Sequence, residues 1–230
     1  MSPSRKPGFT PAADKPVLLL IEGADAFYFV LSQFLKKGNE FAAIHLYDFG
    51  SISELKLQME TLFKAPGFKE CIKAVGVMRD AEDNANSATS SVREAFESVG
   101  IEAPASAGEI RRGAPACGFY LFPDNANPGC LENACLNAYG NPEDVQCAKA
   151  FLDCAERGDK SPNWQAKTLV HALIAIGDKP ELTLGDSAKT GLWNPQSHGL
   201  VRIKSFLQNL CDAVKPQHGT ETESFRLQDS

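Results

Sequence analysis

Four short apolar runs, each separated from the next by a segment suited to a helix, constrain the fold of this chain more than any other feature. The runs are Val17–Ile21, Phe41–Tyr47, Cys71–Met78 and Gly118–Phe122. Continuous apolar strands are typical of sheets that are covered on both faces. Strands that alternate with single helices form βαβ units, in which the strands run parallel. The pattern predicts an α/β fold with a doubly wound, mainly parallel four-stranded sheet and helices on both faces.

The second half of the sequence predicts helices only. Asn141-Pro142 and Ser161-Pro162 each place a capping side chain before a proline, which favours the first position of a helix. Apolar residues recur every three or four positions from Leu200 to Val214, as on one face of an amphipathic helix. We expect a C-terminal helical extension over about 141–215 that packs on the sheet, within a single domain over 16–215.

The two ends of the sequence differ in composition from this domain. Residues 1–15 are rich in proline and residues 216–230 are polar, so we expect a flexible arm and a flexible tail there. Residues 1–16 contain no apolar stretch of the kind that signal peptides carry. The expected location is therefore the cytoplasm, where the 7 cysteines would be reduced thiols.

The charge balance restricts how this chain can bind phosphates. The sequence has 23 Lys and Arg against 29 Asp and Glu, a formal net charge of −6. Proteins that coat nucleic acid nonspecifically depend on cationic side chains that displace phosphate counterions. This composition excludes such a coat, so a phosphate ligand would need metal ions or a local basic patch.

Acidic side chains follow three of the four predicted strands. Glu22 ends the first, Asp80 and Glu82 follow the third, and Asp124 and Glu132 follow the fourth. In an open parallel sheet, the binding crevice lies at the carboxyl ends of the strands. Carboxylates gathered there repel one another, and a hard cation such as Mg²⁺ or Mn²⁺ offsets that repulsion. The sequence therefore predicts an Mg²⁺ or Mn²⁺ site with these five carboxylates as ligands.

This interpretation has one geometric requirement. Glu22 and Asp80 must lie close together and point to the same side of the sheet, so that one cation can serve both. A single acid after a strand is often only a helix cap, and Asp124 has that alternative role. If Glu22 and Asp80 point to opposite sides, the enzymatic interpretation loses its support.

Three motifs carry a resemblance to known proteins. Glu22-Gly23 after a first strand, followed by the acid-x-acid motif Asp80–Glu82 after a third, resembles the Toprim fold of topoisomerases, bacterial primases and overcoming-lysogenization-defect nucleases. The segments IEGADAFYF, RDAED and FPDNANPGCLEN together resemble an uncharacterised bacterial and archaeal family of stand-alone Toprim-like proteins. This similarity spans roughly Val17–Leu210, the later part only through its helical layout.

The resemblance implies roles for individual residues. Glu22 matches the Toprim glutamate that serves as metal ligand or general acid/base, and Asp80 matches the first metal-binding aspartate. Glu82 stands where the second acid is usually an aspartate. Glu132 resembles the additional acid of the nuclease branch, and Lys167 stands where those nucleases often carry a catalytic lysine. The chain lacks the ATPase domain of the larger nucleases, so a separately encoded ATPase is a candidate protein partner.

Together, these features suggest a metal-dependent phosphoryl-transfer enzyme, a nuclease or another phosphodiester hydrolase, with a nucleic acid or nucleotide phosphate as substrate. Arg111 and Arg112 are further candidates for neutralising charge in the transition state. The favoured alternatives are an ordinary polar loop for the two arginines and a solvated position on a helix face for Lys167. The alternative is a binding or regulatory protein that keeps the Toprim-like sheet without turnover. A phosphorylated receiver domain is a weaker hypothesis, because the first strand ends in one glutamate and not an acidic pair.

The two tryptophans are expected to be packing residues. Trp164 and Trp193 both lie in the helical half of the sequence. An indole within a helical lobe more often fills a core than provides a platform for a nucleobase. We therefore expect both side chains to be buried.

Overall fold

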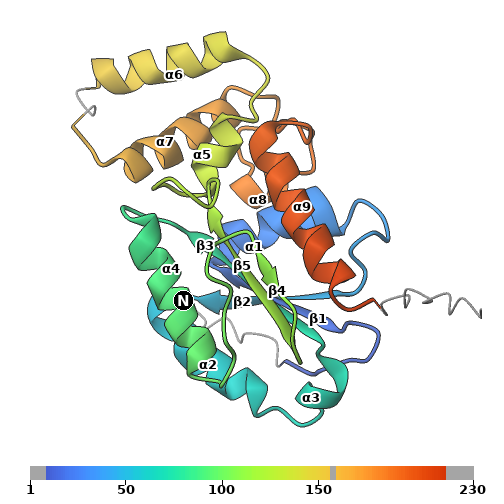
Figure 1. Cartoon of the computed structure of the whole chain (residues 1–230). Coiled ribbons are helices and arrows are strands. Elements are labelled where there is room, and N and C mark those ends of the chain that lie inside the picture. The colour runs from blue at the N-terminus through green and yellow to red at the C-terminus, as the bar shows by residue number, and fades with distance from the viewer. Residues whose placement is uncertain (1–8, 156–158, 216–230) are drawn as a thin grey trace, which may run out of the picture.

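Five strands form the sheet at the centre of the fold (Figure 1). A computed structural model describes residues 9–155 and 159–215. The strand order is β2-β1-β3-β5-β4, with β1, β2, β3 and β5 parallel and β4 antiparallel to β5. The strands are β1 (Val17–Glu22), β2 (Ile44–Gly50), β3 (Ala74–Asp80), β4 (Ile110–Arg111) and β5 (Ala116–Phe122).

The predicted α/β fold with a mostly parallel sheet is confirmed, whereas the predicted number of four strands is wrong. The additional strand, β4, contains only two residues. Period-2 alternation needs about four residues or more to be recognised, so a strand this short gives no sequence signal.

Helices follow most of the strands and make up the second half of the chain. They are α1 (Ala24–Val30), the π-helix η1 (Leu31–Leu35), α2 (Ile52–Phe63), α3 (Phe68–Cys71), α4 (Ala85–Glu97), α5 (Leu131–Leu136), α6 (Pro142–Cys154), α7 (Pro162–Ala175), α8 (Leu184–Ser187) and α9 (His198–Asp212). The predicted caps are confirmed at two of them. The side chain of Asn141 accepts from the Glu143 amide, and that of Ser161 accepts from the Trp164 amide.

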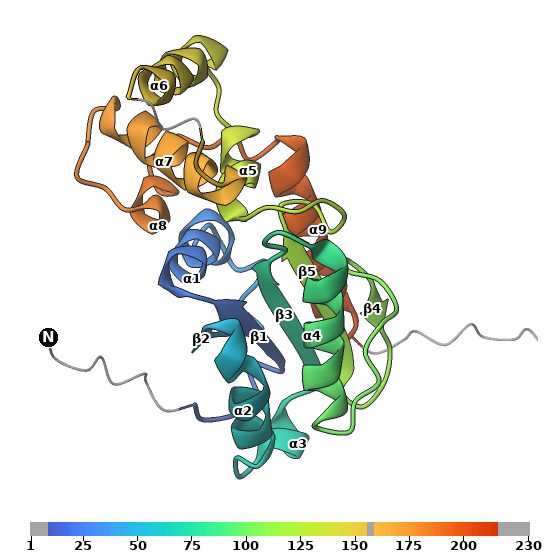
Figure 2. The same cartoon turned by 90° about the vertical axis from the view of Figure 1, so that its left-hand side faces the viewer.

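Two hydrophobic cores lie on opposite faces of the sheet (Figure 2). Successive side chains of a strand point to opposite faces. Leu18 and Leu20 of β1 therefore join the core with α2, α3 and α4. Leu19 and Ile21 join the core with α1, α5 and α9. Helices thus cover both faces, as predicted.

The helices α6 and α7 lie side by side beyond the carboxyl ends of the strands, as both views show. A separate apolar cluster joins them, in which Ala148 and Leu152 of α6 pack with Leu169 and Leu173 of α7. The helix α7 also contacts α5, the short helix that follows β5. The chain after β5 therefore places α7 above the sheet edge that was expected to hold the site.

The segments expected to be flexible lie mainly outside the described residues. This holds for 216–230 and for 1–8. From residue 9 onward the expected arm contacts the sheet, because the Phe9 ring centroid lies 4.9 Å from that of His45. In the described part of the chain, no helix combines the length and apolarity required to cross a membrane.

Candidate functional site

Asp80, Glu132 and Lys167 come from three separate elements and interact at the carboxyl end of the sheet. Asp80 is the last residue of β3, Glu132 is the second residue of α5, and Lys167 lies on α7. Asp80 Oδ1 accepts a hydrogen bond from the Leu131 amide at 3.0 Å, which joins β3 to the start of α5. Glu132 is buried, with 7% of its surface exposed. We refer to Asp80, Glu82, Glu132 and Lys167 as the sheet-edge cluster, where the edge is the one formed by the carboxyl ends of the strands and not an outer strand.

The segment between β5 and α5 positions this cluster. The Glu82 amide donates to the Gly129 carbonyl at 2.9 Å, and the Gly129 amide donates back to the Glu82 carbonyl at 2.7 Å. These two bonds connect the chain after β3 to the residue that precedes Cys130, where α5 is capped. Gly129 has φ of +139°, a conformation that favours glycine.

The environment of Asp80 shifts its proton equilibrium strongly. Burial raises the pKa of Asp80 to about 7, and the charges of Glu132 and Glu82 add to that rise. The Leu131 amide and the Lys167 ammonium oppose it. Near neutral pH, Asp80 is therefore divided between the acid and the carboxylate, a state suited to proton transfer.

Lys167 remains a cation in this setting. Burial lowers its pKa, but the negative charges of Glu132, Asp80 and Glu82 outweigh burial, so the net pKa is raised. Lys167, which is exposed on α7, thus lies within electrostatic range of these acids. The chain itself supplies part of the positive charge that the acids require.

Glu82 lies at the exposed edge of the cluster, just beyond β3. Its backbone has φ of +53°, which turns the chain away from the strand. Its Oε2 accepts a hydrogen bond from Asn163 Nδ2 at 2.8 Å, so the first turn of α7 is tied to the end of β3. The charge of Glu82 raises the pKa of both Asp80 and Glu22. Glu82 therefore lies within electrostatic range of both residues.

Glu22 does not meet the geometric requirement. Ile21 pairs with Met78, and both side chains belong to the core with α1, α5 and α9. One residue further, Glu22 points to the opposite face, where its Oε1 accepts from the Ile52 amide of α2 at 2.9 Å. The shared pocket expected for Glu22 and Asp80 is therefore not formed, because Asp80 faces α5. The interpretation of five carboxylates as one enzymatic metal site thereby loses its support, and a smaller cluster without Glu22 remains.

The partner of Glu22 is Arg79, a residue that the sequence reasoning missed. Arg79 Nε lies 3.2 Å from Glu22 Oε2, and the two side chains are 6% and 18% exposed. Arg79 Nη1 donates to Ser91 Oγ on α4 at 2.8 Å. Burial raises the pKa of Glu22, while Arg79 and the Ile52 amide oppose that rise. The sequence signal was a basic residue at an otherwise apolar position of a buried strand.

Asp124 acts within its own loop. Its Oδ1 accepts from the amides of Ala126 and Asn127 at 3.1 and 2.9 Å, and its Oδ2 accepts from Asn127 Nδ2 at 2.8 Å. Burial raises its pKa, but these hydrogen bonds and the charge of Arg202 lower it below the usual value. The bonding is that of a turn within the loop, whereas the alternative expected for Asp124 was a helix cap, and α5 is capped by Cys130 instead.

Arg111 lies at the wrong end of the sheet for the role proposed for it. It pairs with Cys117 near the start of β5, whereas Asp80 pairs with Phe122 at its end. Five strand residues separate these positions, roughly 17 Å. Arg111 instead forms an ion pair with Glu102. The expectation that Arg111 and its neighbour Arg112 act on a substrate at the sheet-edge cluster is wrong.

The family of the chain follows from its sequence. The sequence model of DUF3226, described as a protein of unknown function, matches residues 16–212. The chain belongs to this family. The resemblance to an uncharacterised stand-alone family is thereby confirmed. No curated protein and no solved structure matches the DUF3226 chain, so its function must be argued from the site.

The capacity of this DUF3226 chain for a metal ion depends on how many ligands the ion needs. Within residues 9–155 and 159–215, no group of three or more His, Cys, Asp or Glu side chains is placed to hold a metal. Mg²⁺ keeps several waters and commonly uses only one or two carboxylates together with substrate phosphates. Asp80 and Glu132 are two carboxyl groups within electrostatic range of each other at the end of β3.

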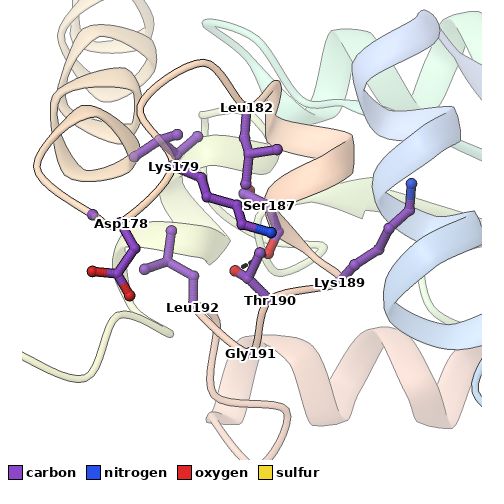
Figure 3. A pocket seen from close by; sticks show the side chains of 10 residues that line it. Asp178, Lys179, Leu182, Ser187, Lys189, Thr190, Gly191 and Leu192 are labelled. Carbon is purple, nitrogen blue, oxygen red and sulfur yellow. Dashed lines mark hydrogen bonds between the residues drawn. The ribbon is translucent and has the colours of Figure 1, made fainter.

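A cavity in this DUF3226 structure lies at the other end of α7 (Figure 3). Its volume is about 610 Å³, and its lining includes Ile174, Lys179, Ser187 and Thr190. None of the predicted site residues lines it. The cavity is therefore separate from the sheet-edge cluster.

Proposed function

We propose that this protein is a phosphodiester hydrolase activated by Mg²⁺ or Mn²⁺, with the sheet-edge cluster as its active site. The observation that carries the proposal is the pair of desolvated carboxyl groups, Asp80 and Glu132, held beside the Lys167 ammonium at the carboxyl ends of parallel strands. A relationship to the Toprim nucleases is part of this proposal. It is supported by the order of the acidic motifs along the chain, although Glu22, the first of them, lies outside the cluster.

Asp80 and Glu132 are the residues that would hold the cation. Their oxygen donors suit Mg²⁺ and Mn²⁺. The raised pKa of Asp80, caused first by burial and then by the charges of Glu132 and Glu82, indicates a carboxylate that Lys167 compensates only in part. When bound, such a cation polarises a phosphoryl oxygen and lowers the pKa of a coordinated water.

The other residues of the cluster have separate tasks. Lys167 binds a non-bridging phosphate oxygen and stabilises the charge that develops on it. Glu82, held by Asn163, is exposed and orients the attacking water. Glu22 has no role in this chemistry. Its ion pair with Arg79 instead fixes β1 against α2 and α4.

A binding or regulatory protein without turnover is the second candidate. Two observations favour it: Glu22 is engaged by Arg79, and the described residues lack a three-ligand metal group. Such a protein would bind the same phosphate ligands at the same cluster. The two candidates therefore differ only in whether a phosphodiester bond is broken.

Cleavage assays separate the two candidates. Labelled single-stranded DNA, RNA and supercoiled plasmid are incubated with Mn²⁺ and either wild type, Glu132→Gln or Lys167→Met. The matched control is Glu97→Gln, which removes one exposed acid at the far end of α4. We expect the cluster variants to lose about 100-fold or more of the wild-type rate, and the control to keep it. Mn²⁺ binding by wild type without cleavage of any substrate would establish the binding protein instead.

A further inference from the structure

The two tryptophans have opposite environments. Trp193 is 1% exposed, as expected, and its Nε1 donates to Ser187 Oγ at 2.9 Å. Trp164, which was expected to pack, is 40% exposed. Its backbone is held on both sides, because its amide donates to Ser161 Oγ and its carbonyl accepts from Thr168 Oγ1. An indole is thus presented to solvent on a well-fixed part of α7.

Trp164 belongs to the same part of α7 that borders the sheet-edge cluster. Asn163 precedes it and bonds Glu82, while Lys167 follows three residues later and interacts with Glu132 and Asp80. Residues three and four apart lie next to each other on a helix, so Trp164 and Lys167 are surface neighbours. The indole therefore lies at the rim of the cluster, about one helical turn from the lysine that would bind a phosphate.

A flat aromatic surface beside a phosphate site suits one class of ligand. Nucleobases stack on exposed aromatic side chains, and this stacking tolerates any base because each has a π-face. A chain with net charge −6 gains little from nonspecific attraction to phosphates, so affinity must come from a contact of another kind. Only an unpaired base can present its face, because bases in a duplex are already stacked on one another.

We propose that Trp164 is a stacking platform for an unpaired nucleobase whose adjacent phosphate lies at the sheet-edge cluster. The inference rests on the proposed function, for which it specifies the substrate as a nucleotide or a single-stranded nucleic acid. Lys167 holds the phosphate end of this ligand, and Trp164 holds the base.

Tryptophan fluorescence tests the proposal directly. Because the chain has 2 tryptophans and Trp193 is buried, quenching by a stacked base reports on Trp164. Wild type is titrated with a thymidine mononucleotide, a single-stranded oligothymidylate, a DNA duplex and an abasic strand of the same length. We expect quenching by one or both of the first two ligands and much weaker binding of the duplex and the abasic strand. The mononucleotide and the oligonucleotide together show which source of the base is bound.

Two substitutions complete the test. By a second method, such as fluorescence anisotropy of the labelled strand, Trp164→Ala should weaken binding roughly ten-fold or more, and Trp164→Phe should recover part of that loss. Unchanged thermal melting of both variants shows that they fold. Equal affinity of wild type for abasic and base-containing strands, or equal affinity of wild type and Trp164→Ala, would overturn the proposal.

The outcome also separates this inference from the proposed function. Metal-dependent cleavage of the abasic strand at the wild-type rate by Trp164→Ala would support the hydrolase and overturn the stacking platform. Quenching by the base-containing ligand, without hydrolysis of any ligand, would support the platform and contradict the hydrolase.

Discussion

Asp80 couples the stability of the fold to pH because it holds a proton more tightly when buried. Its pKa is about 7 in the folded chain, against an ordinary value of 3.8. The folded state therefore binds more protons than the unfolded state between these two values. The contribution of Asp80 to the free energy of unfolding is most favourable at low pH and is lost as the pH rises through 7. At high pH, the ionised Asp80 lowers the free energy of unfolding by roughly 4 kcal/mol as an upper limit.

Asp80→Asn should remove this penalty. Without divalent cations, we expect the variant to have a higher free energy of unfolding than wild type at about pH 8 and a smaller advantage at about pH 5. The asparagine side chain keeps an acceptor for the Leu131 amide, so this bond survives. Denaturant unfolding of both proteins at the two pH values measures the effect. Identical pH profiles would show that Asp80 is an ordinary, fully ionised aspartate.

Glu22→Gln should destabilise the fold without affecting cation binding. Removing one partner of a buried ion pair leaves the Arg79 charge uncompensated, which costs about 3 kcal/mol or more. The glutamine oxygen still accepts a hydrogen bond from the Ile52 amide, so the loss of stability measures the ion pair with Arg79. Denaturant unfolding gives the stability, and calorimetric titration with Mn²⁺ gives the affinity. A variant with wild-type stability but no Mn²⁺ binding would return Glu22 to the ligand set.

At the scale of the elements, the short connection from β5 to α5 sets the position of Glu132. Gly129 pairs with Glu82 through two backbone bonds, and its positive φ directs the chain into α5. A Cβ on Gly129 would lie 2.7 Å from Asn133 Oδ1 and 3.1 Å from Pro123 Cδ. The position is therefore closed to larger residues for two independent reasons, backbone strain and contact.

Gly129→Ala should consequently cost about 1–3 kcal/mol of stability and reduce cleavage, because Glu132 moves with the start of α5. Gly140→Ala is the matched control, since a methyl group added there would meet no atom within 4 Å and the φ of Gly140 is not positive. Thermal melting and the cleavage assay are compared for both variants. Equal behaviour of the two would show that this connection does not position the cluster.

The sequence predicted individual elements better than the directions of their side chains. Cap and proline signals located α6 and α7, and the acid motifs located the ends of β3 and β5. The side on which Glu22 lies depends on the register between β1 and β3. A shift of one residue reverses every side chain, and register is set by packing between distant parts of the chain. Arg79 is recognisable as a basic residue within an apolar strand, but its pairing with Glu22 depends on this same register.

At the scale of the whole molecule, cation binding should appear as stabilisation. A ligand that binds only the folded state stabilises it by about 2.7 kcal/mol at 100 times its dissociation constant. We expect Mn²⁺ to raise the melting temperature of wild type more at about pH 8 than at about pH 6, because protons compete for Asp80 below its pKa near 7. Thermal melting with and without Mn²⁺ measures this shift.

Glu132→Gln is the decisive variant for that measurement, since it removes one of the two carboxylates that would hold the ion. It should show no Mn²⁺-dependent shift, while Glu97→Gln should behave as wild type. A shift that is the same in all three proteins would place the cation elsewhere on the molecule.

The buried ion pair and the carboxyl pair of this protein lie on opposite faces of the sheet. The Glu22–Arg79 pair is sealed beneath α2 and α4, while Asp80 and Glu132 meet on the side of α5. Substitutions beneath α2 and α4 should therefore change the stability of the fold more than the arrangement of Asp80 and Glu132. Stabilising substitutions for this chain should therefore be sought first beneath α2 and α4, away from Asp80 and Glu132.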